Sequence, residues 1–124
     1  MSNQENISHA ATIFAVANMQ ESLDFYAKKL DFNINFTWGE PITYAVLKRG
    51  GVSIHLTTKE DHHAPSKVHC ALYVFVYDVE KIYQQCLDHQ IPIKTPPQVH
   101  DYGMKDFDIT DPDGYIISFG CMQE

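Results

Sequence analysis

The two halves of this chain follow the same pattern, and this repeat is the feature that most limits the fold. A shift of 60 residues aligns His9 with His69, Ala11 with Ala71 and Asn18 with Asp78. Chance similarity between two strand-helix units is the alternative, but the shared cap position and the matched strand-turn-strand endings favour a duplication. The sequence therefore predicts two β-α-β-β-β units, at residues 7–57 and 68–121, joined by a polar linker at 58–67 within a single domain.

Apolar periodicity and turn residues place the elements of both units. Asn18, with Glu21 three residues later, and Asp78 are predicted to cap the two helices. In the first unit we expect a strand, a helix and three strands, at residues 8–16, 19–30, 32–38, 43–48 and 52–57. In the second unit we expect a strand, a helix, a proline-rich edge strand or extended loop, and a hairpin, at residues 68–77, 79–87, 92–97 and 104–119.

The hairpin turns at Asp111-Pro112-Asp113-Gly114. Proline pre-sets φ near −65° at the second turn position, and glycine can take a positive φ. Alternation then places four apolar residues on one face: Phe107, Ile109, Ile117 and Phe119. The opposite face carries Asp106, Asp108, Ile116 and Ser118. One face of this hairpin is therefore expected to pack, and the other is free for chemistry.

Composition and charge exclude several classes of function. The chain has 124 residues, a hydrophobic content of 44% and a net charge of −7, without a lysine or arginine cluster that could bind nucleic acid. Its longest apolar runs, at 10–17 and 71–77, are far shorter than a membrane span. The polar N-terminus does not resemble a signal peptide, and three cysteines without a Cys-x-x-Cys spacing favour reduced thiols. We therefore predict a cytoplasmic protein with no membrane or nucleic-acid partner.

These motifs resemble those of the vicinal oxygen chelate superfamily, which includes glyoxalases, ring-cleaving dioxygenases and bleomycin-resistance proteins. The resemblance rests on the Asp-Pro-Asp-Gly hairpin, on residues 18–26 with their Phe-Tyr pair, and on Leu30-Asp31-Phe32, where aspartate replaces the family's glycine. Residues 68–90 and the turn at 49–51 are most similar to the bleomycin-resistance and glyoxalase branch. The resemblance implies an α+β fold in which two β-α-β-β-β modules form a curved, cup-shaped mixed sheet with helices on its outer face.

The resemblance also implies where a metal would bind. Enzymes of the family hold one divalent metal in the cup, and the four ligand positions map to Ala11, His55, Ala71 and Ser118. Alanine has no donor atom, and a neutral hydroxyl is a poor substitute for a carboxylate. Zinc requires three or four protein donors, and non-haem iron two histidines and a carboxylate. We therefore predict no metal cofactor and no catalytic residue.

A displaced metal site formed by His9, His55 and His69 is an alternative, since two of these histidines lie two residues before the alanines on the same strand face. That displacement is about 6.5–7 Å along a strand, whereas a metal–nitrogen bond is about 2 Å. The competing interpretation is that all three are polar structural side chains. His62 and His63 in the linker are expected to face solvent, and no role is assigned to His100.

The remaining cup positions are mostly aromatic, which suits a planar or amphipathic molecule held by a few polar groups. The predicted ligand-binding residues are Trp38, Tyr44, His55, Tyr73, Phe75, Tyr102, Asp108 and Ser118. Some of these rings are expected to be packing residues instead. Ser118, His55 and Asp108 could form a nucleophilic triad, but Ser118 lies within a strand and lacks a Gly-x-Ser-x-Gly turn. We expect Asp106 to be a solvated strand carboxylate.

The favoured function is that of a metal-independent small-molecule-binding protein. In the bleomycin-resistance branch two chains pair, and cationic drug-like ligands bind in acidic clefts between them. We accordingly expect a homodimer that sequesters a cationic or aromatic ligand or metabolite, and the net charge of −7 fits this expectation. Three alternatives stay open: a metal-dependent lyase or dioxygenase with an unusual ligand set, a metal-free isomerase with His55 or Asp108 as base, and a small dimeric module that binds another protein.

Overall fold

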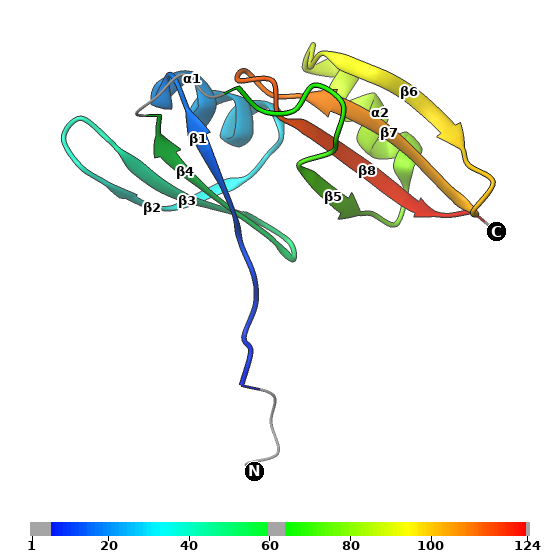
Figure 1. The fold of residues 1–124 in the computed structure, drawn as a ribbon, viewed down its shortest axis with the longest axis horizontal. Helices are drawn as coiled ribbons and strands as arrows, with labels where there is room; N and C mark the ends of the chain where they lie inside the picture. The colour runs from blue at the N-terminus through cyan, green and yellow to red at the C-terminus, as the bar shows by residue number, and fades with distance from the viewer. Residues whose placement is uncertain (1–5, 60–63, 124) are drawn as a thin grey trace.

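The structure, a computed structural model, describes residues 6–59 and 64–123. His62 and His63, expected to face solvent, lie outside the described residues. Two four-stranded sheets lie side by side, each with a helix against it, and their edge strands β1 and β5 face each other across the middle of the molecule (Figure 1). This is the expected α+β architecture of two modules. Within residues 6–59 and 64–123, no helix has the length and hydropathy that a membrane span requires.

The first module contains β1 (Thr12–Val16), α1 (Met19–Asp24), a π-helical segment η1 (Phe25–Lys29), β2 (Asn33–Trp38), β3 (Tyr44–Arg49) and β4 (Val52–Thr58). Its sheet has the order β1-β4-β3-β2, with β1 parallel to β4. The predicted cap is confirmed, because the Asn18 side chain accepts a hydrogen bond from the Glu21 N–H at 3.0 Å. Asp31 takes a φ of +59° one residue after the Leu30 cap of η1, a left-handed conformation that aspartate tolerates better than most residues other than glycine.

The second module contains β5 (Leu72–Phe75), α2 (Val79–Asp88), β6 (Ile93–Val99), β7 (Met104–Thr110) and β8 (Ile116–Met122). Its order, β5-β8-β7-β6, repeats that of the first module strand for strand. The Asp78 carboxylate caps α2 by accepting from the Lys81 N–H. The proline-rich β6 lies at the sheet edge, as predicted, because a proline cannot donate to a central ladder.

Two predicted strands are shorter than expected at their N-terminal ends. β1 begins at Thr12 rather than Ser8, and β5 begins at Leu72 rather than Val68. Pairing with the neighbouring strand starts at those same residues, opposite Ile54 and Ile117 respectively. A β-rich sequence without a ladder partner has no sheet hydrogen bonds to hold it extended, so these stretches lie outside the sheets in the described chain.

The register of the C-terminal hairpin agrees with the prediction. Phe107 pairs with Phe119 and Ile109 with Ile117, and all four side chains are buried in the core. The opposite face, which we call the cup face in both modules, has Asp108 directly across from Ser118. Gly114 takes a φ of +95° in the connecting turn, a conformation that an L side chain rarely adopts.

The modules share one hydrophobic core on their helix sides, and several polar contacts cross between them. The buried Tyr26 hydroxyl of η1 donates to Asp111 in the β7–β8 turn at 2.7 Å. Phe14 of β1 stacks on Tyr115 with ring centroids 4.2 Å apart. The Arg49 guanidinium of β3 donates to the Gln85 side chain of α2 at 3.3 Å. Since these contacts join the helix sides, the two cup faces are left to meet other molecules.

The helix caps provide a first stability test. We expect Asn18→Ala to lower the free energy of unfolding by about 1 kcal/mol, because the Glu21 N–H loses its acceptor. Thermal unfolding followed by circular dichroism should show a melting temperature lower by roughly 3–6 °C for a domain of this size. Asn35→Ala, on the exposed strand β2, is the control, and an equal loss in that variant would contradict the assignment of the cap.

Candidate functional site

The metal positions implied by the family do not carry a metal-binding donor set. Ala11 and Ala71 line a cavity of about 500 Å³ between β1 and β5, and neither has a donor atom. His55 Nδ1 lies 2.6 Å from the Tyr44 hydroxyl, and the Ser118 hydroxyl donates to Asp108 at 2.5 Å. Among residues 6–59 and 64–123, no group of three or more His, Cys, Asp or Glu side chains could hold a metal ion. The residues therefore do not fit the family's metal.

The alternative site of His9, His55 and His69 is not assembled in the described part of the chain. His9 and His69 are exposed and lie outside the strands, and the His9 ring nitrogen contacts Ser8 Oγ at 2.8 Å. The shortened β1 and β5 account for this, because a fixed inward orientation requires a paired strand.

The cup face of the first sheet carries several aromatic side chains, one of which contacts His55. Trp38 pairs with Tyr44 across β2 and β3, and Tyr44 lies edge-on to His55 with centroids 5.5 Å apart. Trp38 is 64% exposed and Phe36 is 50% exposed, which is unusual for rings of this size. Trp38, Tyr44 and Phe36 line a cavity of about 560 Å³ with Thr43, Thr57 and Thr58. Sequence reasoning missed Phe36, although its place two residues before Trp38 would have indicated the same face.

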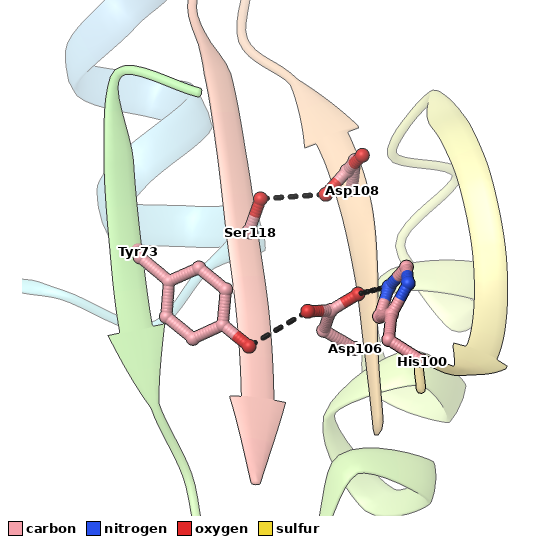
Figure 2. Close-up of polar contacts among 5 residues, drawn as sticks. All are labelled: Tyr73, His100, Asp106, Asp108 and Ser118. Atoms are coloured by element: carbon pink, nitrogen blue, oxygen red, sulfur yellow. Dashed lines mark hydrogen bonds and ion pairs between the residues drawn. The ribbon is translucent and has the colours of Figure 1, made fainter. Parts of the chain in front are cut away.

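On the cup face of the second sheet, five polar residues form two separate hydrogen-bonded groups (Figure 2). Tyr73 reaches from β5 across β8 and donates its hydroxyl proton to Asp106 Oδ2 at 2.7 Å. The other oxygen of Asp106 lies 2.7 Å from His100 Nε2. One step further along β7, Asp108 accepts from Ser118.

Gly120 makes the reach of Tyr73 possible. A Cβ at this position would lie 2.0 Å from the Tyr73 hydroxyl oxygen and 2.9 Å from the Asp106 Cβ. The phenol of Tyr73 therefore occupies the space that a side chain at position 120 would fill. Burial, together with the hydrogen bond to the Asp106 carboxylate, raises the pKa of Tyr73 well above its ordinary value, so the phenol keeps its proton and stays a donor.

The expectation that Asp106 is solvated was wrong, and His100, to which no role was assigned, is its partner. Asp106 is only 7% exposed. A tight turn closed by the hydrogen bond from the Gly103 N–H to the His100 carbonyl folds the chain back. The imidazole stacks on Tyr102 with centroids 4.9 Å apart and only 4° between the ring planes. The glycine after the His-Asp-Tyr segment was the available sequence signal, but the direction of the histidine ring depended on the fold.

The eight predicted binding residues thus fall into two groups. Trp38, Tyr44 and His55 belong to the first sheet, whereas the second sheet and its loop carry Tyr73, Phe75, Tyr102, Asp108 and Ser118. Tyr73 and Phe75 also line the cavity between the modules. The Ser118, His55 and Asp108 triad is not assembled in the described chain. His55 belongs to the first sheet and is hydrogen-bonded there to Tyr44, whereas Ser118 and Asp108 belong to the second sheet.

Solved structures with a similar fold come from several bacteria. TioX from Micromonospora sp. ML1 is 19% identical with a TM-score of 0.79, covering 93% of this chain and 98% of that one. TnmS3, an antibiotic-binding protein from Streptomyces sp. CB03234, is 18% identical with a TM-score of 0.76, covering 97% and 100%. A glyoxalase/bleomycin resistance protein/dioxygenase from Nocardioides is 15% identical with a TM-score of 0.75, covering 98% and 87%. At these identities the likeness concerns the fold.

No curated protein sequence matches the chain significantly. The family model of the Glyoxalase/Bleomycin resistance protein/Dioxygenase superfamily, in contrast, matches residues 6–119, which span both modules and the hairpin. The repeated strand order, the Asp-Pro-Asp-Gly turn and this match agree, and the chain therefore belongs to the glyoxalase/bleomycin resistance protein/dioxygenase superfamily.

Proposed function

We propose that this protein binds and sequesters a cationic or aromatic small molecule without a metal. The observation that carries the proposal is the donor set at the family's metal positions. Ala11 and Ala71 cannot ligate, whereas binding requires only affinity. TnmS3, a neighbour with a similar fold, is an antibiotic-binding protein, which supports a role in small-molecule binding.

The two cup faces offer complementary surfaces for such a ligand. The first sheet presents exposed rings, Trp38 and Phe36, beside the hydrogen-bonded Tyr44 and His55. Apolar contact with large rings supplies affinity for planar molecules. The second sheet presents the carboxylate of Asp108, which favours a positive charge on the ligand.

We further propose that the functional unit is a homodimer in the cytoplasm, in which a second copy covers part of the exposed apolar surface. Ile13 is 60% exposed and Phe75 76% exposed, in addition to Trp38 and Phe36. Exposed apolar surface of this extent favours association or ligand binding. Sedimentation equilibrium should give twice the mass of one chain, and a monomer at micromolar concentration would contradict the dimer.

The free thiols Cys70, Cys86 and Cys121 suit a reducing compartment.

The first experiment measures metal content and ligand-induced stabilisation of untagged protein purified without chelator. We expect no stoichiometric zinc, nickel, manganese or iron, and no change in melting temperature on adding them. A ligand at a hundred times its dissociation constant should stabilise the protein by about 2.7 kcal/mol. Because Trp38 is the single tryptophan, its fluorescence reports directly on binding at the first sheet.

Variants separate binding at this surface from other effects. Phe36→Ser should weaken binding, whereas Tyr77→Ser, which changes a fully exposed ring beyond the end of β5, should not. One metal ion per chain that disappears with His9→Ala, His55→Ala or His69→Ala would overturn the metal-free proposal and favour a lyase or dioxygenase.

A further inference from the structure

On the second cup face, the inner hydrogen-bond donors are already used inside the protein. The Tyr73 hydroxyl donates to Asp106, and the Ser118 hydroxyl donates to Asp108. His100 Nε2 faces the second oxygen of Asp106 at 2.7 Å, so in the neutral imidazole this nitrogen carries the proton. Asp106 therefore accepts on both oxygens and holds its two partners in fixed orientations (Figure 2).

What this arrangement leaves for a ligand is a set of acceptors. Asp108 uses Oδ1 for Ser118, which leaves Oδ2 uncommitted in the described structure. The phenol oxygen of Tyr73 also retains its lone pairs. Other hydrogen-bond donors lie at the edge of this group. They are the side chains of Thr95 and Gln98 on β6, which pair with Asp108 and Asp106 respectively, and the hydroxyl of the exposed Tyr102. An approaching carbonyl or carboxylate would meet oxygen lone pairs at the centre.

Aromatic rings frame these acceptors. Tyr73 lies 5.0 Å from Phe75, and the Tyr102 ring stacks on His100. The Tyr102 ring is thereby held next to the imidazole that contacts Asp106. Desolvation, followed by the negative charges of Asp106 and Asp108, raises the pKa of Tyr102. Rings beside carboxylates form a favourable environment for a cation carried on an aromatic group.

We infer that the second cup face selects its ligand by hydrogen-bond donation: it takes an aromatic compound bearing an ammonium group, and it rejects the same ring bearing a carboxylate. The inference rests on the proposed binding function and specifies the ligand class. Asp108 contacts the ammonium group, Asp106 and Gly120 position Tyr73, and His100 fixes the outer side of Asp106.

Three probes that share one ring test this selection: 1-naphthylmethylamine, 1-naphthalenemethanol and 1-naphthoate, each titrated into the full chain by calorimetry. We expect the amine to bind about tenfold more tightly than the alcohol, as for a charge-assisted hydrogen bond, and the carboxylate to bind most weakly. Asp108→Asn places a donor at the acceptor position with little change in volume. It should reduce the preference for amine over carboxylate by about tenfold.

Asp88→Asn is the matched control, because it removes the same charge from an exposed position on α2. It should leave the preference unchanged. Ser118→Ala releases Asp108 Oδ1 for the ligand and should increase the preference for amine over carboxylate, and loss of the preference in this variant would overturn the inference. Thermal unfolding of each variant verifies that it folds.

The outcomes are distinct. Binding of the three probes with equal affinity, tighter binding of the carboxylate, or an equal effect of Asp88→Asn would overturn the inference and leave the proposed function standing. If none of the probes, and no compound in a wider cationic and aromatic set, bound at millimolar concentration, the proposed function would fail together with the inference.

Discussion

Replacing Asp111 by alanine is expected to lower the free energy of unfolding by about 3 kcal/mol, the largest effect among the substitutions considered. Asp111 is only 5% exposed and accepts hydrogen bonds from the Tyr26 hydroxyl at 2.7 Å and from the Asp113 and Tyr115 N–H groups at 2.9 Å. Alanine leaves the buried Tyr26 hydroxyl without its acceptor and releases the turn that joins the second module to η1. Chemical denaturation followed by circular dichroism measures this loss.

Tyr26→Phe is the matched control for one of these hydrogen bonds. It keeps the ring packed against Phe25 and Phe32 and removes only the hydroxyl, so we expect a loss of about 1 kcal/mol. In the double variant the two losses should not add, because both residues share one hydrogen bond. A loss in Asp111→Ala no larger than in Tyr26→Phe would contradict the proposed role of the turn.

The same carboxyl group predicts a dependence of stability on pH. Burial raises the pKa of Asp111 above its ordinary value, with the hydrogen bonds from Tyr26, Tyr115 and Asp113 acting in the opposite direction. The folded state therefore binds the proton more tightly than the unfolded state, and stability from this group is present at low pH and is lost as pH rises through the folded pKa. Asp111→Asn cannot titrate. The unfolding free energy of the natural protein minus that of Asp111→Asn should therefore fall as pH rises above about 4. A difference that stays constant or rises would contradict the assignment.

Gly120→Ala is expected to have the second largest effect, a loss of about 2 kcal/mol in stability together with loss of the ordered Tyr73 position. An added Cβ would stand 2.0 Å from the Tyr73 hydroxyl oxygen and 2.9 Å from the Asp106 Cβ. The ring has to swing away, and the buried Asp106 then loses one of its two hydrogen-bond partners. One tyrosine should consequently titrate closer to its ordinary pKa in an ultraviolet absorbance titration, since the raised pKa of Tyr73 depends on burial and on Asp106.

Gly51→Ala is the matched control, because a Cβ at that glycine would meet nothing within 4 Å and its φ is not in the left-handed region. It should be neutral or slightly stabilising, since alanine restricts the unfolded chain. In Tyr73→Ala/Gly120→Ala the added methyl group no longer meets a phenol, so the cost of Gly120→Ala should be smaller in that background. If Gly120→Ala behaved like Gly51→Ala in stability and titration, the proposed positioning of Tyr73 would be wrong.

Local sequence patterns predicted the elements and their faces well where the interacting residues are close together in the sequence. The hairpin register of Phe107 with Phe119 follows from alternation around a turn whose glycine takes positive φ. Asn18 and Asp78 cap their helices because a side-chain oxygen near a free N–H needs only a few residues of context. The predicted starts of β1 and β5 were wrong because strand pairing depends on residues far along the chain, in β4 and β8.

The sequence by itself determined the two-module fold and the core face of each strand, since periodicity and turn chemistry are local properties. Its resemblance to the family implied that Ala11 and Ala71 stand at positions where the family's enzymes bind a metal. The tertiary structure alone decided that Tyr73 crosses Gly120 to reach Asp106 and that His100 approaches from the other side. These residues belong to β5, β8, β7 and a loop. Their distances depend on how the strands pair and how the turn closes, and a one-dimensional pattern does not carry that information.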